Sequence, residues 1–289
     1  MLKLLAKLLA QFSLPTIHRL GAGLGWLVHL LTPSNAKIQR DNLLQSGYLQ
    51  SGLVKNNLDV LIKENIAESG KGLLETLAIW QKPEAELLNL VKKVHNWQVV
   101  EDALKLGKGI IFLTPHLGCF EITSIYYGSK QPITVLFRPP KLKWLLGLMN
   151  AGRARTGVDL AEANASGVRK LMQALKRGEA IGILPDQIPK AGEGEWADFF
   201  GRPAYTMTLA CKLAEKTGAA VLMGFGERLP NGTGYELHLT AIPSIATPTL
   251  LNQAIQDQVA KYPSQYLWRY DRWKKRRHAL GAENSNQAV

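Results

Sequence analysis

The segment GIIFLTPHLGCFE, residues Gly109 to Glu121, joins an apolar run to a histidine and then to a carboxylate. The apolar run, Ile110 to Leu113, predicts a buried strand that ends at Thr114-Pro115. His116 then stands at the carboxyl end of that strand, where open α/β sheets place ligands and catalytic groups. On one continuous helix, a separation of five residues would turn the side chains of His116 and Glu121 about 140° apart. We therefore expect His116 on a loop and Glu121 in the first turn of the next helix, from which its carboxylate can orient the imidazole.

Strands and helices alternate through the rest of the chain. Further strands are expected at Trp97 to Val100, Ile133 to Phe137, Val158 to Ala161, Ala180 to Leu184, Ala219 to Gly224 and Tyr235 to Thr240. Alternation of this kind predicts an α/β fold with a mainly parallel sheet of about seven strands, flanked by helices on both faces.

The N-terminal residues 1–35 predict a membrane anchor. Five leucines between Leu2 and Leu9 form an apolar face opposite Lys3 and Lys7, as in an amphipathic helix at a membrane interface. Pro15 interrupts this pattern, and the apolar run from Leu20 to Leu31 falls short of about 20 residues. A tilted transmembrane helix, an interfacial helix and a helix packed on the protein's own core all stay open.

Residues 36–289 are expected to form one α/β domain with a helical N-terminal part, residues 36–96. Candidate helices in that part cover Asn56 to Glu68, Lys71 to Gln81 and Pro83 to Val94, with Gly70 between the first two. No chemical motif is found there.

The chain is strongly basic, with 35 Lys and Arg against 23 Asp and Glu among 289 residues, a formal net charge of +12. This charge favours a polyanionic partner, for which nucleic acid, an anionic membrane surface and an acidic carrier protein all qualify. Aromatic and basic residues alternate from Gln265 to Arg277, which suits nucleic acid, a membrane interface or a closing helix with buried aromatics. The apolar N-terminus has no use in nucleic-acid binding, so we expect no nucleic-acid partner. The two cysteines, Cys119 and Cys211, lack the spacing of a zinc site or a disulfide framework.

An imidazole held by a carboxylate is typical of a general base near neutral pH, whereas a lone histidine is more often structural. A base needs a nucleophile to activate. Cys119 lacks a nucleophile-elbow pattern, so we expect it to be a small buried side chain. The nucleophile is then a hydroxyl group of the substrate. Metal ligation by His116 and Glu121 lacks a third ligand at a recognisable spacing.

Four further side chains are candidates for the same edge of the sheet. Asp186 follows the apolar strand of ILPDQ and would converge with His116, although aspartate after proline is also a common turn residue. Arg138 ends a strand, and Arg153 and Arg155 follow the next helix. Arginines of this kind are usually solvated, yet a guanidinium near the site would bind a substrate phosphate through two hydrogen bonds. The aromatic loop Glu195 to Gly201 suits an acyl chain, a membrane contact or a plug in the core.

These residues carry a resemblance to a known family. HLGCFE is similar to the HX4E motif of the lauroyl/myristoyl acyltransferases of lipid A biosynthesis, the late Kdo-dependent acyltransferases. The blocks LFRPP, GRARTG, LPDQ, GEWADFFGRPAYT and QYLWRYDRWKKR follow in order, so that the resemblance covers about Pro15 to Arg277. Glycerol-phosphate acyltransferases differ, because they have HX4D and a Pro-Glu-Gly block where this chain has Pro-Asp-Gln.

The resemblance implies a glycerolipid-acyltransferase-like fold in which His116 and Glu121 form the catalytic dyad, Arg153 is the essential arginine and Asp186 the essential aspartate. It implies acyl carrier protein as the donor, a hydroxyl of a glycolipid acceptor, the lipid A precursor, and no metal or organic cofactor. It also implies a place at the inner membrane with the active site facing the cytoplasm. Alternatives are another glycolipid or phospholipid acceptor, or a noncatalytic lipid-binding protein on the same scaffold.

Overall fold

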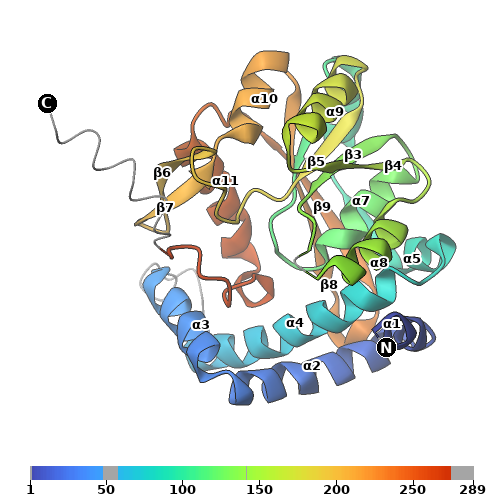
Figure 1. The fold of residues 1–289 in the computed structure, drawn as a ribbon, viewed down its shortest axis with the longest axis vertical. Helices are drawn as coiled ribbons and strands as arrows, with labels where there is room; N and C mark the ends of the chain where they lie inside the picture. The colour runs from blue at the N-terminus through green and yellow to red at the C-terminus, as the bar shows by residue number, and fades with distance from the viewer. Residues whose placement is uncertain (1, 48–57, 141, 275–289) are drawn as a thin grey trace, which may run out of the picture.

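A seven-stranded sheet with the order β1-β9-β8-β2-β5-β3-β4 forms the centre of the computed structural model, which describes residues 2–47, 58–140 and 142–274 (Figure 1). Every neighbouring pair is parallel except β8 and β9, so the predicted α/β fold with a mainly parallel sheet is confirmed. The strands are β1 Val91–His95, β2 Ile110–Leu113, β3 Ile133–Phe137, β4 Val158–Glu162, β5 Ala180–Ile183, β8 Ala220–Arg228 and β9 Tyr235–Ile242.

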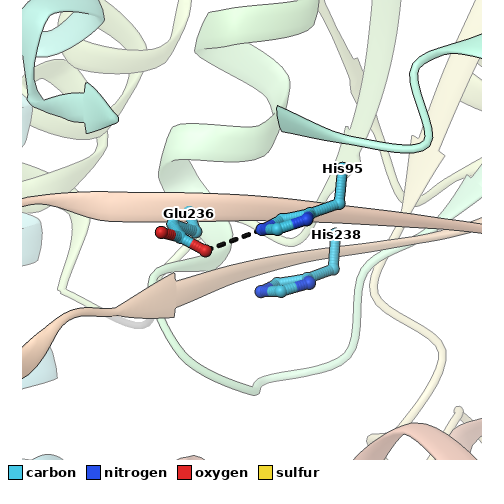
Figure 2. Close-up of side chains that lie close together, drawn as sticks. All are labelled: His95, Glu236 and His238. Atoms are coloured by element: carbon cyan, nitrogen blue, oxygen red, sulfur yellow. Dashed lines mark hydrogen bonds and ion pairs between the residues drawn. The ribbon is translucent and has the colours of Figure 1, made fainter. Parts of the chain in front are cut away.

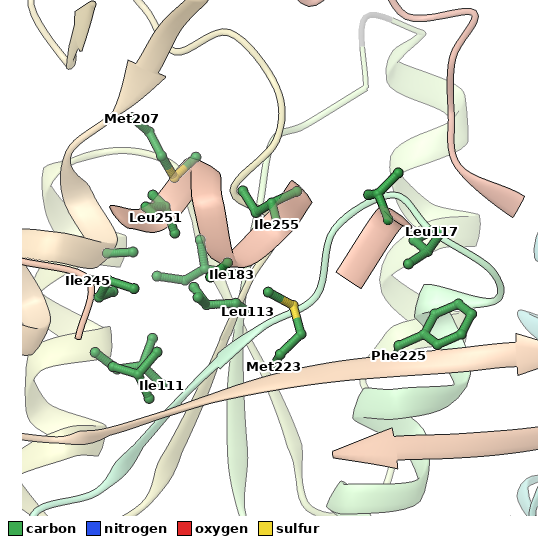
Figure 3. Close-up of a cluster of buried hydrophobic side chains, with 14 of the residues drawn as sticks. Ile111, Leu113, Leu117, Ile183, Met207, Met223, Phe225, Ile245, Leu251 and Ile255 are labelled. Carbon is green, nitrogen blue, oxygen red and sulfur yellow. The ribbon is translucent and has the colours of Figure 1, made fainter. Parts of the chain in front are cut away.

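Strand β2 lies in the middle of the sheet and is buried on both faces. Successive side chains of a strand point to opposite faces, so Ile110 and Phe112 pack on one side, with Tyr127 of α7 (Phe120–Gly128). Ile111 and Leu113 point to the other side and pack into a cluster that includes Leu251 of α11 (Pro248–Lys261) (Figure 3). Leu113 is aligned with Ile183 of β5 and Met223 of β8, so β2 and β5 end at the same edge of the sheet, while β8 continues past them to Arg228.

The remaining helices of the α/β part connect the strands and cover the sheet, together with a β-hairpin. They are α6 Gln98–Lys105, α8 Lys143–Arg153, α9 Ala165–Lys176 and α10 Leu209–Thr217, with short 3-10 turns at η1 Pro230–Gly232 and η2 Pro263–Gln265.

The hairpin, β6 (Gly194–Phe199) and β7 (Arg202–Met207), contains the aromatic residues that were expected in a loop. Phe199 is fully buried and plugs the core, whereas Trp196 is 37% exposed. The amide of Asn252 on α11 donates to the Asp198 carbonyl at 2.9 Å and fixes the hairpin against that helix.

The predicted order of helix and strand between Pro83 and Val100 was wrong. The residues Trp97 to Val100, expected to be a strand, instead begin α6, and the first strand is β1, which starts inside the predicted helix Pro83 to Val94. The helix there, α5 (Glu84–Leu90), is shorter. Val91 and Val94 have the spacing of a helix, but a bulge in β1 between Val91 and Lys93 lets both pack against the same core cluster from a strand.

Gly70 does not separate two helices but lies inside one, α4 (Leu58–Ile79). It packs against α2 (Leu14–Leu31), and a Cβ atom on Gly70 would lie 2.0 Å from the Gly21 carbonyl oxygen. Glycine at this position therefore permits close contact between helices α2 and α4, which run side by side in Figure 1.

The N-terminal helices expose large apolar side chains. Helix α1 (Leu2–Ala10) leaves Leu4 72% exposed, and α2 leaves Leu30 73% exposed, while α3 (Pro33–Gln45) continues the chain. Within the three described ranges, no helix has the length and apolar content needed to span a bilayer.

The segment from Gln265 onward, which follows α11, has buried aromatic side chains. This agrees with the expected closing segment with buried aromatics, except that the backbone is irregular and not helical. Tyr266 and Trp268 are buried, and so is Arg272, which donates to the Tyr205 carbonyl at 2.6 Å. The final residues of the predicted segment, 275–277, lie outside the described residues.

Candidate active site

The loop between β2 and α7 carries His116 and is fixed by backbone hydrogen bonds. Gly118 N–H donates to the Gln265 carbonyl at 3.0 Å, Cys119 N–H to the Gly226 carbonyl at 2.7 Å, and the His116 carbonyl accepts from Leu267 N–H at 3.1 Å. Gly118 has a φ of +56°, and a Cβ atom there would lie 2.2 Å from the Gly226 oxygen. A glycine is therefore required where this loop crosses β8.

A buried arginine holds this loop through a hydrogen bond to its backbone. Arg228, at the end of β8, donates to the Gly118 carbonyl at 2.7 Å and to Glu75 of α4 at 2.6 Å. Glu75 also accepts from His18 of α2 at 2.9 Å. Burial would lower the pKa of Arg228, but the carboxylates of Glu75 and Glu68 raise it, so the arginine stays charged. Sequence reasoning missed this network, because no local pattern connects α2, α4 and β8.

The carboxylate that holds His116 is that of Asp186. Asp186 Oδ1 lies 2.8 Å from His116 Nδ1, and its Oδ2 accepts the His116 backbone N–H at 3.0 Å. Burial alone would raise the pKa of Asp186, but the charge of protonated His116 and the hydrogen bonds from its ring and backbone outweigh burial and lower that pKa. The stability from this pairing is therefore present at neutral pH and is lost as the pH falls through the acidic range in which Asp186 takes up a proton.

Gln187 contacts the second nitrogen of the same ring. Its amide nitrogen lies 3.2 Å from His116 Nε2, and an amide N–H can only donate, so Nε2 is the accepting nitrogen. The proton of neutral His116 is then on Nδ1, facing Asp186. In this tautomer His116 can act as a base, because the lone pair is on Nε2. A substrate hydroxyl would take the place of the Gln187 amide at that nitrogen. Gln187 follows Asp186 in the ILPDQ segment, which was the available sequence signal.

Glu121 has a different partner from the one expected. It lies in the first turn of α7, as predicted, but it accepts hydrogen bonds from Arg153 of α8, with Arg153 Nε 3.0 Å from both carboxylate oxygens and Nη2 2.5 Å from Oε1. The predicted orientation of His116 by Glu121 was therefore wrong, and Asp186 takes that place. The reason is that β2 and β5 are neighbours, which brings Asp186 directly under the His116 loop.

The other candidate residues divide between the site and the scaffold. Arg138 lines the same cleft as His116 and donates to the Ile188 carbonyl at 3.2 Å. Arg155 donates to the Ile79 and Lys82 carbonyls at 2.5 and 2.9 Å and so serves the scaffold. Cys119 is buried, as predicted, and burial raises the pKa of its thiol well above the usual range.

His116 lies between two hollows of the surface. A cleft of about 670 Å³ runs past Arg138, Arg153 and Lys212, so that one side of His116 faces basic groups. A second hollow of about 580 Å³ is lined mostly by apolar side chains of α1, α2 and α4, among them Leu5, Leu24 and Leu73. The histidine can therefore be reached from a basic side and from an apolar side.

Comparison with known proteins agrees with the resemblance seen in the motifs. A family model described as bacterial lipid A biosynthesis acyltransferase matches residues 3–275. The lipid A biosynthesis lauroyltransferase of Escherichia coli K12 is 26% identical over 93% of this chain and 89% of its own length. The palmitoleoyltransferase of the same organism is 28% identical over 92% of this chain and 87% of its own, and a lipid A biosynthesis acyltransferase of Haemophilus influenzae is 25% identical over 91% and 85%.

The two ion pairs predict separate energetic couplings. Asp186→Asn removes the acceptor of either the ring N–H or the backbone N–H of His116, so we expect turnover to fall by about 10²- to 10⁴-fold, as on loss of a general base. A double-mutant cycle of acyl-transfer rates should couple Asp186→Asn with His116→Ala. Glu121→Gln should couple with Arg153→Ala instead. Coupling of Glu121→Gln with His116→Ala, and none for Asp186→Asn, would contradict this assignment.

Proposed function

Because the chain belongs to the bacterial lipid A biosynthesis acyltransferase family, we propose that it transfers a fatty acyl chain from acyl carrier protein to a hydroxyl group of a lipid A precursor. The observation that carries this proposal is the accepting Nε2 of His116, which is fixed by Asp186 and lies where the basic cleft meets the apolar hollow.

His116 acts as the general base in this reaction. Its Nε2 takes the proton from the acceptor hydroxyl as that oxygen attacks the carbonyl carbon of the thioester. The C–S bond of the tetrahedral intermediate then breaks, and the carrier's sulfur receives the proton back from His116. The products are an ester on the acceptor and a free thiol on the carrier. Asp186 stabilises the imidazolium that exists between the two proton transfers.

The oxyanion of the intermediate needs hydrogen-bond donors. Backbone N–H groups of Leu117, Gly118 and Cys119 already donate to carbonyl oxygens. Phe120 and Glu121, the first two residues of α7, have no such acceptor among the described residues, and N–H groups at a helix N-terminus favour negative charge. We assign the oxyanion to these two groups, each worth about 10²- to 10³-fold in rate.

The two hollows beside His116 differ in polarity, which supports a separate entry route for each substrate. Arg138, Arg153 and Lys212 line one cleft and suit the acidic carrier protein and substrate phosphates. Glu121 holds Arg153 in place in this cleft through their ion pair. This ion pair gives a role both to Glu121, at the dyad position of the family motif, and to Arg153, at the position of the essential arginine. The apolar hollow opens toward α1 and α2 and suits the acyl chains of a lipid acceptor.

Helices α1 and α2 form an interfacial anchor in this proposal. Leu4, Leu27, Leu30 and Leu31 are exposed, and an amphipathic helix of this kind lies in the headgroup region with basic side chains at its rim. The membrane is the inner membrane, with the site on its cytoplasmic side, where the carrier protein is found.

Acyl transfer can be tested directly with purified protein. We expect acyl chains to pass from labelled acyl carrier protein to a lipid A precursor, with mass spectrometry of the product showing one added ester. His116→Ala should lower the rate by at least about 10²-fold while Lys105→Ala, at the end of α6 and outside the residues that line either hollow, keeps it unchanged. Transfer to a phospholipid alone would favour the alternative acceptor. Equal turnover by His116→Ala and the wild type would favour a noncatalytic lipid-binding protein.

Membrane association has its own test. The double variant Leu27→Glu, Leu30→Glu places two charges on the exposed face of α2, so its binding to anionic phosphatidylglycerol vesicles should fall at least 10-fold. Leu106→Glu is the matched control, because Leu106 is an exposed leucine on the distant C-terminal side of α6. Equal losses for both variants, or none, would refute a membrane face on α2.

A further inference from the structure

Four potential metal ligands gather on one face of the sheet. None of them belongs to the loop that carries His116, which meets β8 at Gly226, the residue before Glu227. His95 ends β1, Glu236 and His238 lie on β9, and Glu227 is near the end of β8. His95 is aligned with His238, and Glu227 with Glu236. Aligned residues, and residues two apart on one strand, share a face, so the sheet pairing itself brings the four side chains together.

The two imidazoles lie against each other as a stack. Their centroids are 4.4 Å apart and their planes differ by 4°. Figure 2 shows both rings presenting a nitrogen on the same side, toward the Glu236 carboxylate. The ligand atoms of His95, Glu236 and His238 all lie within 4.8 Å of one another.

Each imidazole also has a carboxylate at its Nε2 atom. His95 Nε2 lies 2.6 Å from Glu236, and His238 Nε2 lies 2.8 Å from Glu227. The four side chains are 21–28% exposed, so an ion can enter from solvent.

The donor set selects a class of ion. Calcium and magnesium prefer oxygen ligands alone, whereas two imidazoles with carboxylates are typical of zinc and neighbouring divalent ions. Zinc binds these atoms at about 2.0–2.2 Å, so the ligand atoms of one tetrahedral ion lie about 3.3 Å apart. Binding therefore requires the contacts of 2.6 and 2.8 Å to open and the parallel rings to tilt toward a shared ion. Lys93 is aligned with Glu236 but is exposed, and the Tyr262 hydroxyl lies 3.4 Å from His238 Nε2.

We propose that His95, Glu236 and His238 bind a divalent ion of the zinc class. Glu227 contacts His238 Nε2 but lies outside this group of mutually close ligand atoms, so its side chain must rotate toward the ion to serve as a fourth ligand. The ion takes the place of the protons that now join the histidines to their carboxylates. It is structural, because it ties the edge strand β1 to β9 and β8 and uses none of the side chains that surround His116. The proposal is independent of the acyl acceptor and donor.

Calorimetric titration of full-length, tag-free protein with zinc chloride at neutral pH tests this site. We expect one equivalent to bind, and His95→Gln and His238→Gln each to weaken affinity by at least about 100-fold. Glu227→Gln should weaken it about 10-fold, and unchanged affinity would overturn its assignment as a ligand. His29→Gln is the matched control, because His29 lies on α2, and it should bind as the wild type does.

Thermal unfolding provides a second measurement that does not use enzyme activity. Zinc should raise the melting temperature of the wild type and of His29→Gln, but not that of His238→Gln, whose metal-free form should melt close to the metal-free wild type. Equal zinc affinity in the wild type and His238→Gln would overturn the site. Loss of binding in His116→Gln, with binding retained in His238→Gln, would also overturn it by placing the ion at the other histidine.

Discussion

The hydrogen bonds between Asp186 and His116 connect the ends of two neighbouring strands, and the geometry of the site depends on them. One carboxylate accepts both the ring N–H and the backbone N–H of His116, so it fixes the position of the loop and the tautomer of the imidazole together. The Asp186 carboxylate can reach both N–H groups because β2 and β5 are parallel, in register and end at the same edge. The Nε2 atom, opposite the carboxylate, is thereby left facing the substrate side.

Two more buried ion pairs surround this contact and give each part of the scaffold a fixed place. Glu121 and Arg153 join α7 to α8, and Glu75 and Arg228 join α4 to β8. Charges buried in this way are tolerated only when they are paired, since removing one partner leaves an uncompensated charge. The site is therefore built from three carboxylates with separate partners, the imidazole of His116 and the guanidinium groups of Arg153 and Arg228. This arrangement explains why the carboxylate nearest to His116 in sequence is not the one that holds it.

The sequence predicted the sheet better than the contacts between its ends. Strands β2 and β3 were predicted with their observed bounds because each is a short apolar run between turn residues. The sequence also predicted that Asp186 would converge with His116, and the structure confirms it. Which of the two carboxylates holds the imidazole could not be read from sequence, because spacing along the chain does not reveal that Arg153 takes Glu121 as its partner. Gly70 shows the same limit, because a glycine that ends a helix and one that permits close helix packing look alike. The roles of His116, Glu121, Arg138, Arg153 and Asp186 in catalysis and binding stay predictions.

The central claim, that Asp186 and not Glu121 sets the state of His116, can be measured by nitrogen-15 NMR of the imidazole, assigned by its absence in His116→Gln. In the neutral ring, Nδ1 should carry the proton and Nε2 should not, with the Nδ1 proton shifted downfield by its hydrogen bond to a carboxylate. Glu121→Gln should leave this signal unchanged, and Asp186→Asn should remove its downfield shift. A proton on Nε2 in the wild type, or a signal that responds to Glu121→Gln and not to Asp186→Asn, would contradict the account.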